Sequence, residues 1–167
     1  MSGADPVLAY LGLGGNIGDR ARALHEACDR IAALPGTELL RVSPLYETEP
    51  WGYLEQDAFL NAVVEVRTSL QPFELFRSGK DIERAMGRTP TDRNHPRIID
   101  IDVLLYGTII LDDPALRIPH PGIPVRRFVL QPLRDLAPDL EHPVLHIAMR
   151  ELLERCIDSG VVRPHRS

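Results

Sequence analysis

The sequence has only 2 cysteines among its 167 residues, and neither belongs to a Cys-x-x-Cys motif. Cys28 and Cys156 therefore form no zinc-ligand pattern, and both are expected to be reduced thiols of the core. No apolar run approaches the roughly 18 residues of a membrane-spanning helix, and residues 1–6 lack the charged and apolar regions of a signal peptide. These absences favour a cytoplasmic protein with no membrane partner.

Positive charge is also scarce, with 19 Lys and Arg against 24 Asp and Glu and a net charge of -5. This balance excludes a general nucleic-acid binder held by bulk positive charge, so no nucleic-acid partner is expected. The length fits one domain over residues 1–167, and 44% hydrophobic content suffices for one core. We expect a monomer.

Apolar periodicity predicts strands and helices in the order βαββαβ. The expected strands cover residues 7–12, 38–46, 61–68 and 98–106, and the expected helices cover residues 19–34 and 70–87. Frequent prolines after residue 107 predict short helices and turns. The order predicts an α+β fold, a ferredoxin-like βαββαβ sandwich with an antiparallel sheet and extra C-terminal helices.

Two glycine-containing segments do not fit the nucleotide-binding motifs that they resemble. Residues 12–18, GLGGNIG, place the last glycine one position late for the dinucleotide motif Gly-x-Gly-x-x-Gly. Residues 78–81, SGKD, lack the upstream glycine of a P-loop and the Ser or Thr that follows its lysine. The glycines of residues 12–18 are expected to permit a tight turn, with Asn16 or Asp19 capping the helix that follows.

The strongest chemical signal is a pair of aspartates in an otherwise apolar strand, residues 98–106. Side chains two positions apart on a strand share a face, so Asp100 and Asp102 lie together. Two adjacent carboxylates repel each other unless a cation or a proton lies between them, and oxygen ligands favour Mg²⁺ or Mn²⁺. The alternative is a solvent-facing edge strand with alternating aspartates.

Arginines gather on both sides of this strand, which is unusual in an acidic chain. Arg84, Arg88, Arg93 and Arg97 precede it, and a second group at residues 126–127 follows His120. Guanidinium groups bind phosphate oxygens through paired hydrogen bonds. A metal pair beside arginines is suited to binding a polyphosphate during transfer, while the alternative for each arginine is a solvated loop.

Six motifs in order resemble the 6-hydroxymethyl-7,8-dihydropterin pyrophosphokinase family of folate biosynthesis. They are GLGGNIGDR, SPLYETEPWG, FLNAVVEV, IERAMGR, PRIIDIDVLLYG and IPHPGIPVRRFVLQPL. The resemblance implies a Mg²⁺-dependent enzyme that transfers pyrophosphate from ATP to 6-hydroxymethyl-7,8-dihydropterin and releases AMP. It also implies two Mg²⁺ ions as cofactors and ATP as co-substrate.

The resemblance further implies a role for each matching residue. Asp100 and Asp102 would hold the metal ions, and Arg88 and Arg97 would act with them in catalysis by contacting the phosphates. Glu83, His120 and Arg126 would contribute to the nucleotide site. The pterin site would comprise Thr48, Trp51, Phe59, Asn61 and Phe128, with the two phenylalanines on either side of the ring.

Two other functions are compatible with parts of the pattern. A two-metal phosphohydrolase could use the same aspartates, with water instead of the pterin alcohol as acceptor. An RNA-binding module shares the βαββαβ order, but the aromatic-rich motif of such modules is absent and the net charge is unsuitable.

Overall fold

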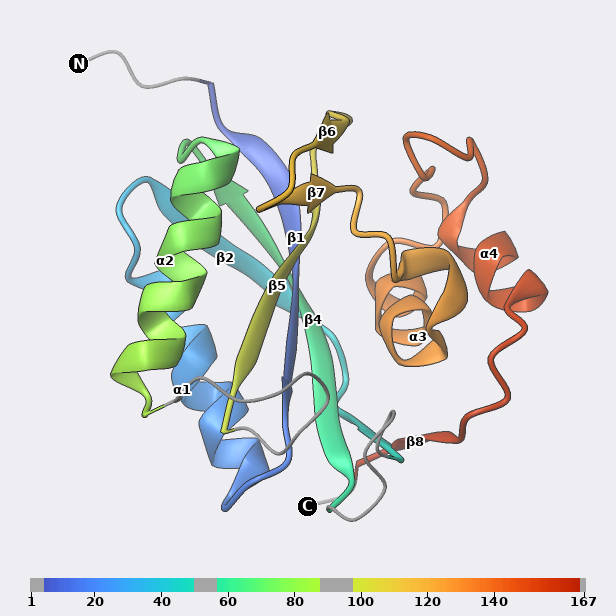
Figure 1. Cartoon of the computed structure of the whole chain (residues 1–167), viewed down its shortest axis with the longest axis horizontal. Coiled ribbons are helices and arrows are strands. Elements are labelled where there is room, and N and C mark those ends of the chain that lie inside the picture. The colour runs from blue at the N-terminus through green and yellow to red at the C-terminus, as the bar shows by residue number, and fades with distance from the viewer. Residues whose placement is uncertain (1–4, 50–56, 88–97, 166–167) are drawn as a thin grey trace.

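The computed structural model describes residues 5–49, 57–87 and 98–165 (Figure 1). Its elements are β1 (Val7–Gly15), α1 (Arg20–Ala32), β2 (Thr37–Val42), β3 (Tyr46–Thr48), β4 (Phe59–Thr68), α2 (Pro72–Ala85), β5 (Asp100–Tyr106), β6 (Leu111–Asp112), β7 (Arg117–Ile118), a 3₁₀ helix (Ile123–Val125), α3 (Arg127–Leu136), α4 (Met149–Arg155) and β8 (Val162–Pro164). The fold is α+β with an antiparallel sheet, as the sequence predicts.

The main sheet has six strands in the order β5-β1-β4-β3-β8, and β2 also pairs with β4. The strand expected over residues 38–46 is divided into β2 and β3. Between them, Ser43 donates its N–H to the carbonyl of Val63 and accepts the N–H of Val63 on its Oγ, at 2.9 Å each. Pro44 follows and has no N–H for a ladder, so the pairing restarts at β3.

Helices cover both faces of this sheet (Figure 1). Along β1, Leu11 and Leu13 join the core formed with α1 and α2, whereas Tyr10 joins the core formed with α3 and α4. This alternation is the period of two that a strand imposes. The α3 face therefore receives alternate residues of β1 and β4. In β5 the register shifts opposite Tyr10 and Leu11, so the consecutive residues Leu104 and Leu105 both lie in the α3 core.

The prediction that the glycines of residues 12–18 form a turn is wrong for the first of them, which lie in a strand. Gly12 and Gly14 lie inside β1, and only Gly18 of this run adopts a positive φ, 69°. Asp19 is the N-cap of α1 and accepts the N–H of Arg22 at 3.1 Å. Asn16 instead donates its side-chain amide to the carbonyl of Asp57 at 2.9 Å.

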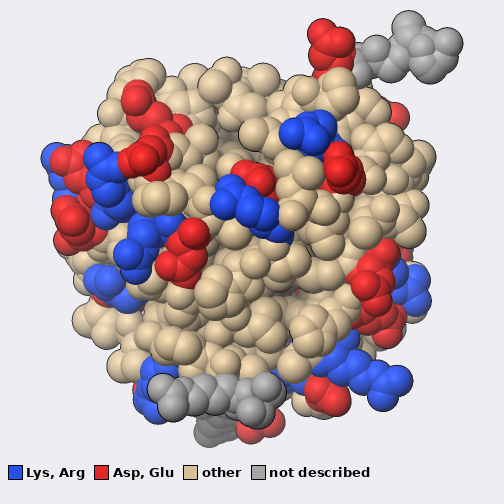
Figure 2. Space-filling model, turned by 180° about the vertical axis from the view of Figure 1, so that it is seen from behind, with Lys and Arg blue, Asp and Glu red and all other residues tan. Residues whose placement is uncertain are grey.

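The surface and the cysteines agree with an ordinary globular chain. Acidic and basic side chains are interspersed over the face that Figure 2 shows from behind. Cys28 is buried, Cys156 is half-buried, and both are free thiols. In the three described ranges, no helix is long and apolar enough to cross a membrane.

A buried carboxylate connects β4 with β1 and β2. Glu65 is 6% exposed and accepts the Tyr10 hydroxyl, while both of its oxygens accept hydrogen bonds from Arg41 at 2.9 Å. The Arg41 hydrogen bonds hold the pKa of Glu65 below its ordinary value although burial opposes this. The charged form of Glu65 thus stabilises the folded state.

We predict that Glu65→Gln lowers the free energy of unfolding at pH 7 by about 1 to 3 kcal/mol, because a charge-assisted hydrogen-bond pair is lost. The folded pKa is lowered, so this stabilisation is present above about pH 4.5 and disappears as the pH falls through the folded pKa. Urea unfolding at pH 7 and pH 3 measures the difference.

The matched control is Glu38→Gln. Glu38 and Arg67 also form an ion pair between β2 and β4, but both of their side chains are exposed. Exposed pairs contribute little, so this variant should stay within about 0.5 kcal/mol of the wild type. Equal losses for Glu65→Gln at both pH values would contradict the assignment.

Candidate functional site

A pocket opens on the α3 face of the sheet and collects most of the predicted site residues. Eight of them line it: Thr48, Phe59, Asn61, Asp100, Asp102, His120, Arg126 and Phe128. Trp51, Arg88 and Arg97 lie outside the described residues. Residues far apart in the sequence, from β3 to α3, therefore meet in one place.

Strand register explains this meeting. Gly14 of β1 pairs with Asn61 of β4 on one side and with Asp100 of β5 on the other. Residues paired across antiparallel strands point to the same face, so Asn61 and Asp100 lie on either side of a glycine. Gly12 has the same relation to Asp102. The pocket has an amide half on β4 and a carboxylate half on β5.

The two glycines form the floor between these halves, a role that sequence reasoning missed. A Cβ atom on Gly14 would lie 2.7 Å from Oδ1 of Asn61, whereas a Cβ atom on Gly12 would lie 3.4 Å from Cδ1 of Leu104. Gly14 thus leaves room for the amide group. The alternation of Gly12 and Gly14 with buried leucines was the available signal for a strand.

The carboxylate half is electrostatically strained. Burial, and secondarily the neighbouring Asp100, raises the pKa of Asp102 to about 7. The positive charges of Lys80 and Arg126 act in the opposite direction but do not cancel these effects. Two carboxylates held this close favour the binding of a cation or a proton.

The donor set fits Mg²⁺ as a metal shared with a ligand. In the ranges that the structure describes, no group of three or more His, Cys, Asp or Glu side chains could hold a metal ion. Asp100 and Asp102 would thus provide carboxylate oxygens, with the remaining ligands supplied by water and phosphate. Mg²⁺ is commonly bound in this way, through one or two carboxylates and a polyphosphate.

Glu83, a predicted nucleotide residue, lies beside the pocket but is not among its described lining residues. It is 3% exposed, and its Oε2 accepts the N–H of Ile101 at 2.7 Å and the ammonium of Lys80 at 2.9 Å. Lys80 also donates to the carbonyl of Ile101 at 3.3 Å. These contacts fix α2 to the strand that carries both aspartates. Lys80, like the two glycines, was missed by sequence reasoning.

His120 has its ring oriented by the backbone. Its Nδ1 accepts the N–H of Gly122 at 2.9 Å. The backbone N–H of His120 donates to the carbonyl of Leu104, also at 2.9 Å. Because Nδ1 is an acceptor, the proton of the neutral ring is assigned to Nε2.

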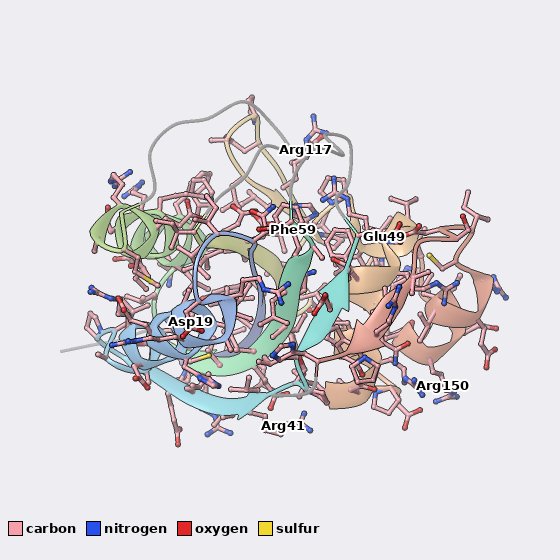
Figure 3. The ribbon with its side chains drawn as sticks, turned by 90° about the horizontal axis from the view of Figure 1, so that it is seen from below. Asp19, Arg41, Glu49, Phe59, Arg117 and Arg150 are labelled. Atoms are coloured by element: carbon pink, nitrogen blue, oxygen red, sulfur yellow. The ribbon has the colours of Figure 1, made fainter. Side chains whose placement is uncertain are left out.

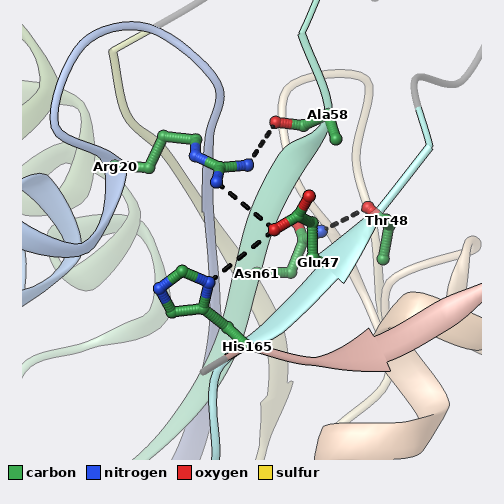
Figure 4. Close-up of polar contacts among 6 residues, drawn as sticks. All are labelled: Arg20, Glu47, Thr48, Ala58, Asn61 and His165. Carbon is green, nitrogen blue, oxygen red and sulfur yellow. Dashed lines mark hydrogen bonds and ion pairs between the residues drawn. The ribbon is translucent and has the colours of Figure 1, made fainter. Parts of the chain in front are cut away.

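The other half of the pocket combines an amide with aromatic rings. Asn61 is 7% exposed and donates its Nδ2 to the hydroxyl of Thr48 at 2.7 Å (Figure 4). Phe59 and Phe128 are half-buried in the lining, and the Arg126 guanidinium lies 5.9 Å from the ring centre of Phe128. Figure 3 shows Phe59 where β4 begins and Glu49 where β3 has ended, and both residues line the pocket. A flat ring with polar edges fits this half.

Two comparisons show the family, and a third concerns the fold. The sequence profile described as 7,8-dihydro-6-hydroxymethylpterin-pyrophosphokinase (HPPK) matches residues 10–138. The chain is 44% identical over 155 residues to a 2-amino-4-hydroxy-6-hydroxymethyldihydropteridine pyrophosphokinase of Methylorubrum extorquens, covering 93% of this chain and 97% of that protein. It is 42% identical over 154 residues to the folic acid synthesis protein fol1 of Schizosaccharomyces pombe, covering 92% of this chain.

The chain spans only 21% of that fol1 protein. Among solved structures, the HPPK-DHPS protein of Plasmodium falciparum has a TM-score of 0.72 and 19% identity, covering 90% of this chain and 45% of that one. This last likeness concerns the fold alone. From the profile and the bacterial relative together, the chain belongs to the 7,8-dihydro-6-hydroxymethylpterin-pyrophosphokinase family and is an enzyme of the transferase class.

Proposed function

We propose that this enzyme transfers a pyrophosphoryl group from ATP to the hydroxymethyl oxygen of 6-hydroxymethyl-7,8-dihydropterin, with Mg²⁺, and releases AMP. The observation that carries the proposal is the row Asn61–Gly14–Asp100 across three strands. It places a group suited to a heteroaromatic ring next to a group suited to a metal-bound polyphosphate. Family membership supports this substrate pair.

The pterin would occupy the amide half of the pocket. Asn61 presents both a donor and an acceptor, and its orientation is fixed by Thr48. Phe59 and Phe128 offer aromatic faces, and Trp51 is proposed as a further wall of the site. Such a set orients a flat ring so that its hydroxymethyl group points toward the carboxylate half.

ATP would occupy the carboxylate half. Asp100 and Asp102 would hold the two expected Mg²⁺ ions, which when bound neutralise and orient phosphate oxygens. Arg126 and His120 would donate hydrogen bonds to the phosphates, and Arg88 and Arg97 are proposed to do so from outside the described residues. Glu83 remains a predicted nucleotide contact, and its bond to Ile101 supports a second role in holding β5.

The catalytic power in this proposal comes from orientation and charge. The two halves hold the acceptor oxygen and the phosphate chain in one pocket, which replaces an encounter in solution by a fixed geometry. The arginines stabilise the charge that redistributes over the phosphates. No covalent intermediate on a protein side chain is required.

The wider proposal is one ferredoxin-like domain over residues 1–167, acting as a cytoplasmic monomer without nucleic-acid or membrane partners. The strand order β5-β1-β4-β2 supports the ferredoxin-like assignment. The two free thiols are consistent with a reducing compartment.

The test of function is AMP formation from ATP that depends on added hydroxymethyl-dihydropterin. We expect AMP and a diphosphorylated pterin in equal amounts, and no AMP without the pterin. A phosphohydrolase would instead be indicated if water acted as the acceptor. Inorganic pyrophosphate or phosphate would then form at the same rate with and without the pterin.

For the metal site, we predict that Asp102→Asn lowers turnover by at least about two orders of magnitude, because a charged ligand is lost. The raised pKa of Asp102 means that its ionisation destabilises the folded state as the pH rises from its ordinary 3.8 to about 7. In EDTA, the variant should therefore melt at a higher temperature than the wild type at pH 8, and this gain should shrink at pH 5.

Asp29→Asn on the exposed side of α1 is the control for this prediction. It should change neither the turnover nor the pH dependence of melting. Full activity of Asp102→Asn would remove this residue from the metal site.

For the pterin half, we predict that Gly14→Ala raises the KM for the pterin about tenfold to a hundredfold, because the new methyl group displaces the Asn61 amide from its position. The KM for ATP should change less than about twofold. Gly12→Ala is the matched comparison, since its methyl group meets Leu104 at an ordinary distance. Equal effects of the two variants on the pterin KM would show that Asn61 does not bind the ring.

A further inference from the structure

Residues 156–165 run from the end of α4 to the residue after β8. They contact elements on both sides of the amide half of the pocket, which is the proposed pterin site and is called the pterin half below. Neither the catalytic carboxylates nor the phosphate-binding arginines belong to this segment. It is here called the strap.

At its first end the strap holds the beginning of α3. Asp158 Oδ2 accepts the N–H of Arg127 at 3.0 Å, and its carbonyl accepts Nε of the same arginine at 3.1 Å. A third bond joins Nη2 of Arg127 to the carbonyl of Cys156 at 3.3 Å. Arg127 lies between Arg126 and Phe128, two lining residues, so these bonds fix the backbone that carries both.

Asp158 also supplies what α3 lacks in its own sequence. The N-cap residue Arg126 makes no side-chain capping bond, and the first turn of α3 contains no acidic residue. A carboxylate at this helix end satisfies an otherwise uncapped N–H and is favoured by the helix dipole. A residue about thirty positions away in the chain thus caps the helix that presents Phe128.

At its other end the strap holds β3. Val162 of β8 pairs with Thr48, and the N–H of His165 donates to the carbonyl of Leu45 at 2.8 Å. β3 has three residues, and the pairing with β8 covers all of them. Because Thr48 accepts the amide of Asn61, the position of β3 sets the orientation of that amide.

A polar junction joins this end of the strap to β4 (Figure 4). The carboxylate of Glu47 lies 3.7 Å from Nδ1 of His165 and 3.3 Å from Nη2 of Arg20. Arg20 in turn donates Nη1 to the carbonyl of Ala58 at 2.9 Å, directly before Phe59. The junction therefore connects the strap with the strand end that carries the first aromatic wall.

We propose that the strap is the positioning element of the pterin half, with Asp158 and His165 as positioning residues, and this rests on the proposed function. Asp158 sets the helix end that presents Phe128. His165 and β8 set β3 and, through the Glu47 junction, the beginning of β4. The strap thus fixes the spacing between the two aromatic walls and the amide, and small displacements of such groups strongly affect binding and turnover.

The experiment uses the full-length chain and measures the KM for the pterin, the KM for ATP and the melting temperature. We expect His165→Ala to raise the pterin KM about threefold to tenfold and to leave the ATP KM within about twofold. Asp158→Ala should raise the pterin KM at least as much, and it should also raise the ATP KM because Arg126 adjoins the same helix end. Asp158→Asn retains one acceptor oxygen and should lie between this variant and the wild type.

Asp139→Ala is the control, since its carboxylate pairs with Arg150 at an exposed position in the same C-terminal part of the chain. It should change neither KM. A lower melting temperature with an unchanged pterin KM in both His165→Ala and Asp158→Asn would overturn the proposal, as would an equal rise of both KM values in His165→Ala. Absence of pterin-dependent AMP from the wild type would overturn the proposed function, and the role of the strap with it.

Discussion

The pairing of β1 with β4 on one side and β5 on the other is the constraint on which the pocket depends. It places Gly14 between Asn61 and Asp100, and thereby holds groups of different chemistry two strand spacings apart, about 9.5 Å. Backbone hydrogen bonds fix that distance, so neither half can move independently within the sheet. The helices α1 and α2 stabilise this arrangement from the opposite face, where the core residues of the same strands are buried.

The carboxylate half shows a conflict between stability and function. Asp102 is held beside Asp100 in a half-buried position, which costs folding free energy when both are ionised. Glu83 adds another acidic side chain nearby, but its oxygen is bound to Lys80 and to the backbone of Ile101. The Glu83 carboxylate is thus neutralised by Lys80, while the pair on β5 is the proposed binding site of a cation.

Sequence periodicity predicted the α+β order and the shared face of Asp100 and Asp102. The shared face could be predicted because the side chains of a strand point alternately to its two faces. The division of residues 38–46 was missed, although Pro44, which has no N–H for a ladder, was the available signal; the accompanying bonds between Ser43 and Val63 are tertiary. The glycines of β1 were assigned to a turn because glycine usually signals one, and their function depends on what lies opposite on β4. Lys80 was missed because its contact with β5 is tertiary.

The three residues of β3 illustrate how a very short strand keeps its register. Tyr46 donates its hydroxyl to Asp135 on α3, Glu47 pairs with Arg20, and Thr48 accepts from Asn61. Each contact requires a different side-chain chemistry on an alternating face, so a slip by one residue would turn the Glu47 carboxylate toward Asn61 and break the three bonds together. An apolar strand of this length would have several nearly equivalent registers. The polar side chains of β3 therefore select a single alignment between β4 and β8, and three consecutive residues specify it.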